Sequence, residues 1–311
     1  MNRDHSNNME GGFALPLTLI VLAMLITLAL GLMHTSVQRV NNAYLLKERW
    51  HNALQIQNML NVIAWNLLAG TKEHNKVIHA GVTIPIDGHA FEIQGMQIKV
   101  QDESGLIPLE FFQQKAVDNV MKNVMKNTRG KVTDMNPAAI LGDWVDVDQI
   151  PRISGLEKQS YKMKNYKYMP RNHPLRTLDE LLEVPLIDYD LFNGVRGKPG
   201  LRDIFVLGAS GQVNYATAPD EALAALLPSN SGLLKLVVQA RNQGNWPELM
   251  HLIYLANGES DNPLTPGAKF RIKIRSVDKL MSGRFEIILQ SQADGRAFSV
   301  NLWQLPDFPR G

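Results

Sequence analysis

The feature that most constrains this chain is an uninterrupted apolar stretch near its N-terminus. From Phe13 to Met33 the sequence contains no charged residue. A helix of about 20 residues spans roughly 30 Å, the thickness of the hydrocarbon core of a bilayer. A core helix of a soluble domain normally keeps a polar face, and this stretch has none. Pro16 lies in the first turn, where a missing backbone N–H costs least. The stretch therefore predicts a membrane-inserting helix.

Two simple interpretations of this stretch leave features unexplained. The small residues Ala29 and Gly31 could form a signal-peptidase site, but the apolar run is longer than a usual signal core and the residues before it are not basic. If the stretch is a plain anchor, Arg39, Lys47 and Arg49 follow the span. The positive-inside rule would then place the C-terminal side in the cytoplasm. The sequence alone does not resolve that conflict.

The composition excludes several classes of protein. The 311 residues suffice for a large core, and the formal net charge of +2 is unusual for a dedicated nucleic-acid binder. The chain has no cysteine, which excludes disulfides, thiol nucleophiles and cysteine metal sites. The eight histidines form no His-Glu-x-x-His motif, and no nucleophile elbow or phosphate-binding loop is present. We therefore expect no enzymatic activity.

The apolar helix is predicted to continue beyond the membrane. Residues 34–68 contain neither Pro nor Gly, and their apolar residues recur at roughly helical spacing. Gly70 is a typical helix stop. The sequence predicts one helix from about 14 to 68. A coiled coil is the alternative, although no clean heptad is visible.

The remainder predicts strands at both ends and helices between them. Alternating or β-branched segments occur at Val77–Ile86, Ala90–Gln94, Met96–Val100, Phe270–Val277, Phe285–Ser291 and Phe298–Trp303, with a turn expected at Asp87 and Gly88. Residues 106–262 are mainly of helical type. This order predicts an α+β fold with one antiparallel sheet that carries a large helical insertion. We expect the part from about residue 70 onward to fold alone.

Four acidic residues in the middle of the chain are candidate metal ligands. Asp143, Asp146, Asp148 and Glu157 are closely spaced, and calcium prefers several oxygen ligands. They do not form an EF-hand loop. Helix capping and surface charge are the alternative explanation.

The junction of the polar leader and the apolar helix resembles a prepilin processing site. Gly12 is followed by Phe13 and an apolar helix, as in chains cut after the glycine by a dedicated peptidase and methylated on the new N-terminus. Most pilins carry Glu at the fifth mature position, where this chain has Leu17. The family of minor pseudopilins called general secretion pathway protein K, in type II secretion systems, typically lacks that glutamate.

Further segments extend this resemblance along the chain. They match the family's patterns in order, at Asp102–Gly105 (DESG), Asp143–Asp148 (DWVDVD), Gly155–Glu157 followed by Tyr161, His173–Val184, and Val213–Ala218 (VNYATA). Members of that family have been associated with calcium in the inserted region. Here Lys158 stands where a further acid is usual.

The resemblance implies a pilin-like fold and a place at the pseudopilus tip. It implies a single-pass inner-membrane protein with a periplasmic head, whose partners are the I- and J-type minor pseudopilins, the major pseudopilin and the prepilin peptidase, without nucleic acid. The regions expected are a leader (1–12), a transmembrane segment (13–33), a helix continuation (34–70), a pilin-like head (71–105 and 263–311) and an inserted helical domain (106–262).

A minor pilin with a DNA-binding role, in a type IV pilus or competence system, is the alternative. Residues 213–227 resemble a helix-hairpin-helix module but lack its glycine hairpin. Residues 158–176 interleave six Lys or Arg with three Tyr, a composition that can bind a nucleic-acid strand by charge and stacking. A solvated loop or a face for a protein partner is the simpler interpretation.

Overall fold

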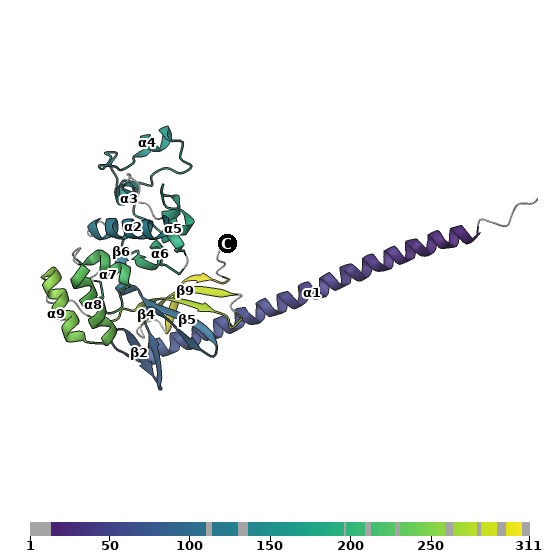
Figure 1. The fold of residues 1–311 in the computed structure, drawn as a ribbon, viewed down its shortest axis with the longest axis horizontal. Helices are drawn as coiled ribbons and strands as arrows, with labels where there is room; N and C mark the ends of the chain where they lie inside the picture. Colours follow the sequence, from purple (N-terminus) through teal and green to yellow (C-terminus); the bar gives the residue numbers. More distant parts are fainter. Residues whose placement is uncertain are drawn as a thin grey trace, which may run out of the picture. The chain divides into compact units, whose positions relative to one another are not determined.

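A single N-terminal helix dominates the first part of the chain in the computed structural model. The structure describes residues 14–109, 114–129, 136–195, 197–208, 213–227, 231–258, 264–278, 281–290 and 297–306. Helix α1 (Ala14–Ala69) has 56 residues, which confirms the helix predicted from about 14 to 68 (Figure 1). The chain forms two units, residues 1–55 and 56–311. In the first unit, every described side chain from 15 to 50 is exposed.

The end of α1 belongs to the core of the second unit. Its buried side chains recur every three or four residues, as one face of a helix does, at Ile56, Met59, Leu60, Ile63, Ala64 and Leu67. A side chain on Gly70 would meet Val77 Cγ1 at 2.5 Å, so the glycine lets the next strand approach the helix end. The second compact unit therefore begins at Ile56 and includes the end of α1, whereas the sequence predicts independent folding from about residue 70.

The first strands form a small three-stranded antiparallel sheet. It consists of β1 (Thr71–Lys72), β2 (Lys76–His79) and β3 (Val82–Pro85), in the order β1-β2-β3. The single strand predicted over Val77–Ile86 was wrong, because Ala80 and Gly81 both have positive φ and form a two-residue hairpin turn. The turn expected at Asp87 and Gly88 was also wrong. These residues open β4 (Asp87–Ile93) at a shift of register.

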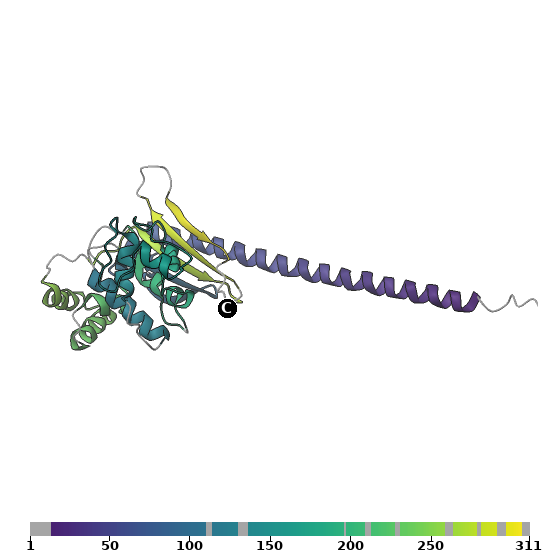
Figure 2. The same cartoon turned by 90° about the horizontal axis from the view of Figure 1, so that it is seen from above.

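The main sheet has five antiparallel strands in the order β10-β9-β8-β5-β4. Besides β4 they are β5 (Met96–Asp102), β8 (Lys269–Arg275), β9 (Ser282–Leu289) and β10 (Phe298–Gln304). Strands β5 and β8 pair directly, from Gln97 with Arg275 to Asp102 with Phe270. Strands predicted at the two ends of the sequence thus share one sheet, which confirms the α+β fold (Figures 1 and 2).

Helical segments predominate between β5 and β8, as predicted for residues 106–262. Among the described residues these segments are η1 (Glu103–Gly105), α2 (Gln114–Arg129), α3 (Pro137–Val145), α4 (Lys158–Met163), η3 (Leu178–Glu183), α5 (Tyr189–Asn193), α6 (Leu201–Ile204), α7 (Asp220–Leu226), α8 (Ser231–Gln243) and α9 (Trp246–Asn257). A short parallel pair that the sequence analysis did not predict, β6 (Ile107–Pro108) with β7 (Phe205–Val206), lies among them. Their own apolar core contains Met121, Trp144, Tyr161, Phe192 and Leu223.

A buried carboxylate ties the sheet to this helical region. Asp102, the last residue of β5, accepts hydrogen bonds from Asn214 Nδ2 (3.4 Å), Thr217 Oγ1 (3.2 Å) and Gly267 N (3.2 Å), and from Ser104. Two segments quoted for the family resemblance, 102–105 and 213–218, therefore meet at this carboxylate. Side chains of these two segments and the backbone N–H of Gly267, two residues before β8, donate to the same carboxylate, so this joint depends on tertiary structure.

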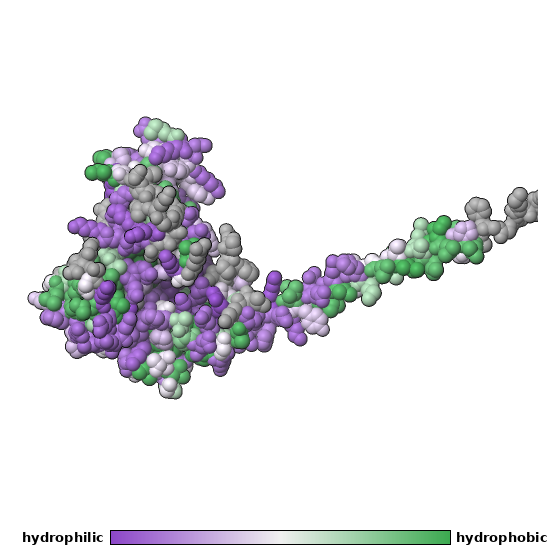
Figure 3. Space-filling model, in the orientation of Figure 1, coloured by the Kyte–Doolittle hydropathy of each residue, from purple (hydrophilic) through white to green (hydrophobic). Residues whose placement is uncertain are grey.

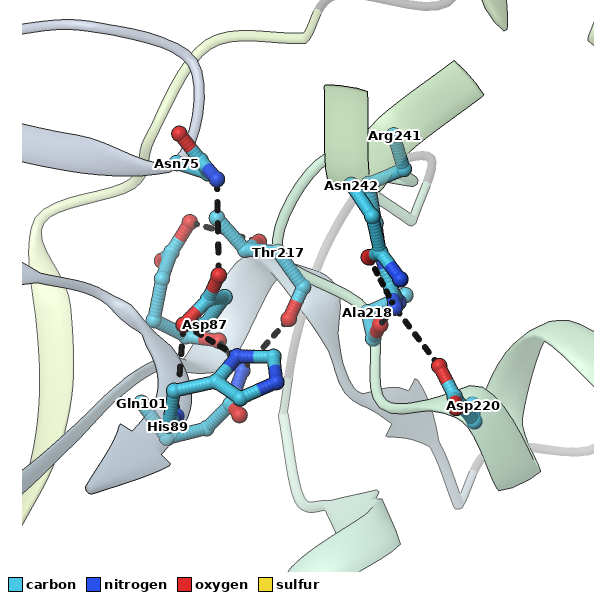
Figure 4. Close-up of polar contacts among 10 residues, drawn as sticks. Asn75, Asp87, His89, Gln101, Thr217, Ala218, Asp220, Arg241 and Asn242 are labelled. Carbon is cyan, nitrogen blue, oxygen red and sulfur yellow. Dashed lines mark hydrogen bonds and ion pairs between the residues drawn. The ribbon is translucent and has the colours of Figure 1, made fainter. Parts of the chain in front are cut away.

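Two further side chains hold the segment around Thr217 in place. Gln101 Nε2 donates to the Thr217 carbonyl at 2.9 Å. From α8, the buried Arg241 donates to the Ala218 carbonyl at 2.7 Å and to Asp220 at 2.6 Å (Figure 4). The segment is thus fastened from the sheet on one side and from a helix of the insertion on the other.

Candidate cation site and assembly helix

The exposed part of α1 is the first candidate functional feature. Within the described residues, one helix is long and apolar enough to cross a membrane, judged by length and composition, and it is α1. Hydrophobic residues cover much of the N-terminal part of α1 in the space-filling view (Figure 3). Large apolar side chains also remain exposed beyond the predicted span, including Tyr44, Leu46, Trp50 and Trp65. So much apolar surface on one element marks a site of contact with lipid or with other polypeptides. The processing-site residues Gly12 and Phe13 lie outside the described residues.

Three of the four predicted acidic ligands come together at the ends of two helices. Asp143 lies in the last turn of α3, Asp146 follows that helix as its C-cap, and Glu157 precedes α4 as its N-cap. One carboxylate oxygen from each lies within 4.8 Å of the others. Asp148 is not part of this group. It is exposed, and its carboxylate accepts from Ile150 N at 2.8 Å.

Arg152 is the cation already present beside this cluster. Its Nη1 lies 2.8 Å from Asp143 Oδ1 and also donates to Asp146 Oδ2. Its backbone N–H donates to both Asp143 oxygens at 3.2 Å. The sequence analysis did not single out Arg152, although an arginine close to three acids is the signal that could have identified it.

Glu157 is the candidate ligand whose charge remains unmatched. Its side chain is 4% exposed, and neither carboxylate oxygen has a hydrogen-bond partner within the part of the chain that the structure describes. Burial raises the pKa of Glu157, and the negative charges of Asp143 and Asp146 raise it further, whereas the backbone N–H of Lys158 lowers it. Asp146 Oδ1 is likewise buried and unpartnered. Three buried carboxylate oxygens therefore lack a donor at hydrogen-bond geometry among the described residues.

The absence of a side chain at Gly155 leaves space for the cluster. A Cβ on Gly155 would lie 2.0 Å from Asp143 Oδ2, so no larger residue fits there without moving the carboxylate. Tyr161 and Trp144 pack nearby with ring centroids 5.8 Å apart. Burial raises the pKa of Tyr161, and Tyr166, Asp143 and Glu157 raise it further. The phenol therefore stays neutral and adds no charge to the cluster.

The donor set fits a hard divalent cation. All available ligand atoms are carboxylate oxygens, which suit calcium or magnesium better than softer metals. The unpartnered oxygens of Asp146 and Glu157 supply an independent reason for a ligand there, since buried polar atoms are normally paired. Asp143, Asp146 and Glu157 are the residues that would hold the ion.

The basic stretch 158–176 presents charge but few aromatic faces. Its exposed lysines are Lys158, Lys162, Lys164 and Lys167. Of its three tyrosines, Tyr161 is buried and Tyr166 is half-buried, with its ring packed edge-on at 5.4 Å from Tyr161. Only Tyr168 of the three is exposed, so stacking of successive bases along the stretch is not favoured.

Comparisons with known proteins agree with one another. The family model "Type II secretion system (T2SS), protein K" matches residues 113–196, which include the acidic cluster. Type II secretion system protein K of Pectobacterium carotovorum subsp. carotovorum is 26% identical over 268 residues, covering 77% of this chain and 78% of that protein. The protein of the same name from Klebsiella pneumoniae is 25% identical over 267 residues, with the same coverage.

A solved structure shares the fold. The crystal structure of the GspK-GspI-GspJ complex from the enterotoxigenic Escherichia coli type 2 secretion system contains a chain that aligns with a TM-score of 0.52 at 15% identity. The alignment covers 86% of this chain and 99% of that one. Family model, relatives and fold together confirm the resemblance found in the sequence, to the minor pseudopilins known as type II secretion system protein K.

Proposed function

We propose that this chain caps the tip of the periplasmic pseudopilus of a type II secretion system and helps to initiate its assembly for protein export across the outer membrane. The observation that carries the proposal is the exposure of α1, whose described side chains from 15 to 50 are all accessible. An apolar helix of this length gains stability only when lipid or other helices cover it. Its proposed role is structural, without catalysis.

The proposed life of the subunit begins in the inner membrane. A prepilin peptidase cuts after Gly12, and Phe13 becomes the N-terminal residue. Residues 13–33 then hold the subunit as a single-pass protein with its head in the periplasm. Replacing Gly12 by Ala should block maturation, because the peptidase must accommodate the residue before the cut, while membrane insertion is unchanged. Normal maturation of the variant on a gel would argue against the prepilin interpretation.

The proposed partners in the filament are the I- and J-type minor pseudopilins and the major pseudopilin. The solved complex with the same fold is, by its title, one of GspK with GspI and GspJ. Contact through α1 can be tested with single cysteines, since the chain has none of its own. Leu46→Cys on α1 should crosslink to these partners. Leu255→Cys on α9, at nearly equal exposure (63% against 65%), is the control and should not.

Capping is tested separately from membership of the filament. Gold-labelled antibodies against the head should mark one end of isolated pseudopili. Labelling along the whole filament would reject the tip position and leave membership intact.

We also propose that Asp143, Asp146 and Glu157 hold calcium. The support is the convergence of three carboxylates with three unpartnered buried oxygens. Calorimetric titration of the detergent-solubilised chain with CaCl₂ should show one binding site, and Asp146→Asn should abolish this binding. Asp148→Asn is the matched control, since this exposed residue lies outside the cluster and should leave binding unchanged. Absence of calcium binding to the wild-type chain would reject the site.

A further inference from the structure

Arg152 divides the oxygens of the acidic cluster into two sets. Its guanidinium contacts Asp143 Oδ1 and Asp146 Oδ2. The other oxygen of Asp146 is free of side-chain partners, and that of Asp143 accepts only the Arg152 backbone N–H among the contacts described. Both oxygens of Glu157 are free as well. Each aspartate thus gives one oxygen to the arginine and keeps one for the cluster.

The guanidinium is built into this position. A Cβ on Gly142 would lie 2.9 Å from Arg152 Nε, so the glycine leaves the space that the arginine side chain fills. The backbone N–H of Arg152 is fixed to the same Asp143 carboxylate. The backbone N–H and the guanidinium of Arg152 therefore both fix the position of the Asp143 carboxylate. Such a residue orients ligands from outside the coordination sphere and does not compete for it.

The charges decide between retention and displacement of the arginine. Asp143, Asp146 and Glu157 carry three negative charges when ionised, and Arg152 carries one positive charge. A divalent ion neutralises the cluster only when the arginine stays. Displacement would leave one net negative charge in a largely buried site, which is unfavourable at low dielectric.

We propose that Arg152 is a positioning residue that remains in place when the cation binds, orients Asp143 and Asp146 toward it, and sets the preference of the site for divalent over trivalent ions. This inference rests on the proposed calcium site. The charge of a guanidinium would ordinarily be expected to weaken the binding of a metal ion, and the inference gives Arg152 a supporting role in this site.

The test compares two substitutions in the full-length chain in detergent. Arg152→Lys keeps the charge but loses the planar group that reaches both aspartates. It should weaken Ca²⁺ and Tb³⁺ binding alike, by roughly 10- to 100-fold, with little change in their ratio. Arg152→Gln removes the charge, and the ratio of Tb³⁺ to Ca²⁺ affinity should rise. Tb³⁺ luminescence sensitised by Trp144 and Tyr161 gives one affinity, and its displacement by Ca²⁺ gives the other.

The controls and the contrary outcomes are distinct. Arg171→Gln removes another paired arginine of the same region, bound to Glu180, and should leave both affinities unchanged. If Arg152→Lys binds Ca²⁺ as tightly as the wild type or more tightly, the arginine competes with the ion and the inference is wrong. An unchanged ratio in Arg152→Gln would reject its role in selectivity. If the wild-type chain binds neither ion, the calcium site itself fails.

Discussion

Glu157 shows how a single side chain can reduce stability in one condition and support it in another. Its buried carboxylate has no donor, a state that costs about 1–3 kcal/mol for a polar group and more for a charged one. A bound cation would provide the missing charge. The residue is therefore expected to destabilise the cation-free protein and to stabilise the loaded one.

The variant Glu157→Gln separates these two effects. In EDTA we expect its unfolding free energy to exceed that of the wild type by about 1–3 kcal/mol, because a buried unpaired charge is gone. In millimolar CaCl₂ the order should reverse, since only the wild type gains stability from binding. Thermal melts of both chains in both buffers measure this. A variant that is less stable in EDTA would show that Glu157 has an unseen partner.

The joint at Asp102 makes a prediction about pH. Burial raises the pKa of Asp102 above the usual value of 3.8 for an aspartate, whereas hydrogen bonds from Ser104, Gly267 and Thr217 lower it. Burial also lowers the pKa of the nearby Lys72, whereas the charge of Asp102 raises it. The folded state therefore holds the Asp102 proton more tightly than the unfolded state does. The contribution of Asp102 to stability is fully present below pH 3.8 and decreases as the pH rises through the folded pKa.

Urea unfolding of the wild type and Asp102→Asn at several pH values tests this sign. The difference in unfolding free energy, wild type minus variant, should fall as the pH rises from about 4 and then become constant. Ser104→Ala, which keeps the carboxylate, serves as a control that still titrates. A difference that grows with pH would mean that the hydrogen bonds outweigh burial.

At the residue level the sequence could predict the candidate ligands but not their arrangement. Asp143, Asp146 and Glu157 were identifiable because hard cations need closely spaced acids. Asp148 was included for the same reason, yet its carboxylate turns to the adjacent Ile150 N–H. Arg152 was missed because its pairing with Asp143 depends on a loop conformation that spacing does not specify.

Among the elements, α1 serves two environments with one continuous helix. Its first part is exposed throughout, whereas its last part contributes six buried apolar side chains to the folded unit. Complete burial of an Ile, Leu or Met side chain stabilises the folded state by about 1.5–3 kcal/mol. Their sum is comparable to the whole stability of an ordinary domain, about 5–15 kcal/mol. The end of α1 is therefore part of the head.

Two truncated chains can test whether the head needs the end of α1 to fold. A chain of residues 56–311 should fold cooperatively as a soluble protein, and one of residues 70–311 should not. Circular dichroism melts and size-exclusion chromatography distinguish them. To separate loss of packing from loss of length, Ile63→Ala in the longer chain should cost about 2–5 kcal/mol, whereas Asn61→Ala, at an exposed position of the same turn, should cost little. Equal melting of the two truncations would contradict the buried role of α1.

Element type was more predictable than element boundaries. The long helix and the strands β8, β9 and β10 followed from composition and alternation. The β2–β3 hairpin was missed because its turn, Ala80 and Gly81, lacks the Asn or Asp that usually marks such turns. The β6–β7 pair was unpredictable because two-residue strands have no periodicity, and their partners lie about 100 residues apart.

For the whole molecule, Leu17 makes a prediction about the place of the subunit in the filament. A pilin glutamate at that position is thought to pair with the amine of the subunit above, and a tip subunit has none above it. Leu17→Glu should therefore give no gain in secretion. It would place an unmatched carboxylate in lipid, at a cost of about 2–3 kcal/mol at the centre of a span and less near the surface.

Secretion of an exported enzyme and crosslinking to partner pseudopilins measure the effect of Leu17→Glu. Leu17→Gln, with the same size and no charge, controls for the loss of the leucine. Improved secretion by Leu17→Glu, or its incorporation along the filament, would show that the missing glutamate does not mark a tip position.

The direct pairing of β5 with β8 has a consequence for how the chain acquires its structure during synthesis. The Asp102 carboxylate and the Gly267 amide that it binds are 165 positions apart, so the central pair of the sheet closes a very long loop. Contacts of this separation form slowly, because the chain loses the entropy of closing the loop before the contacts can stabilise it. Until β8 has been synthesised, the helical insertion can fold around its own core, but the edge of β5 that pairs with β8 remains without a partner strand. We therefore expect the sheet to be the last part to form, and its nascent edge to be the part of this protein that depends most on chaperones on its way to the filament.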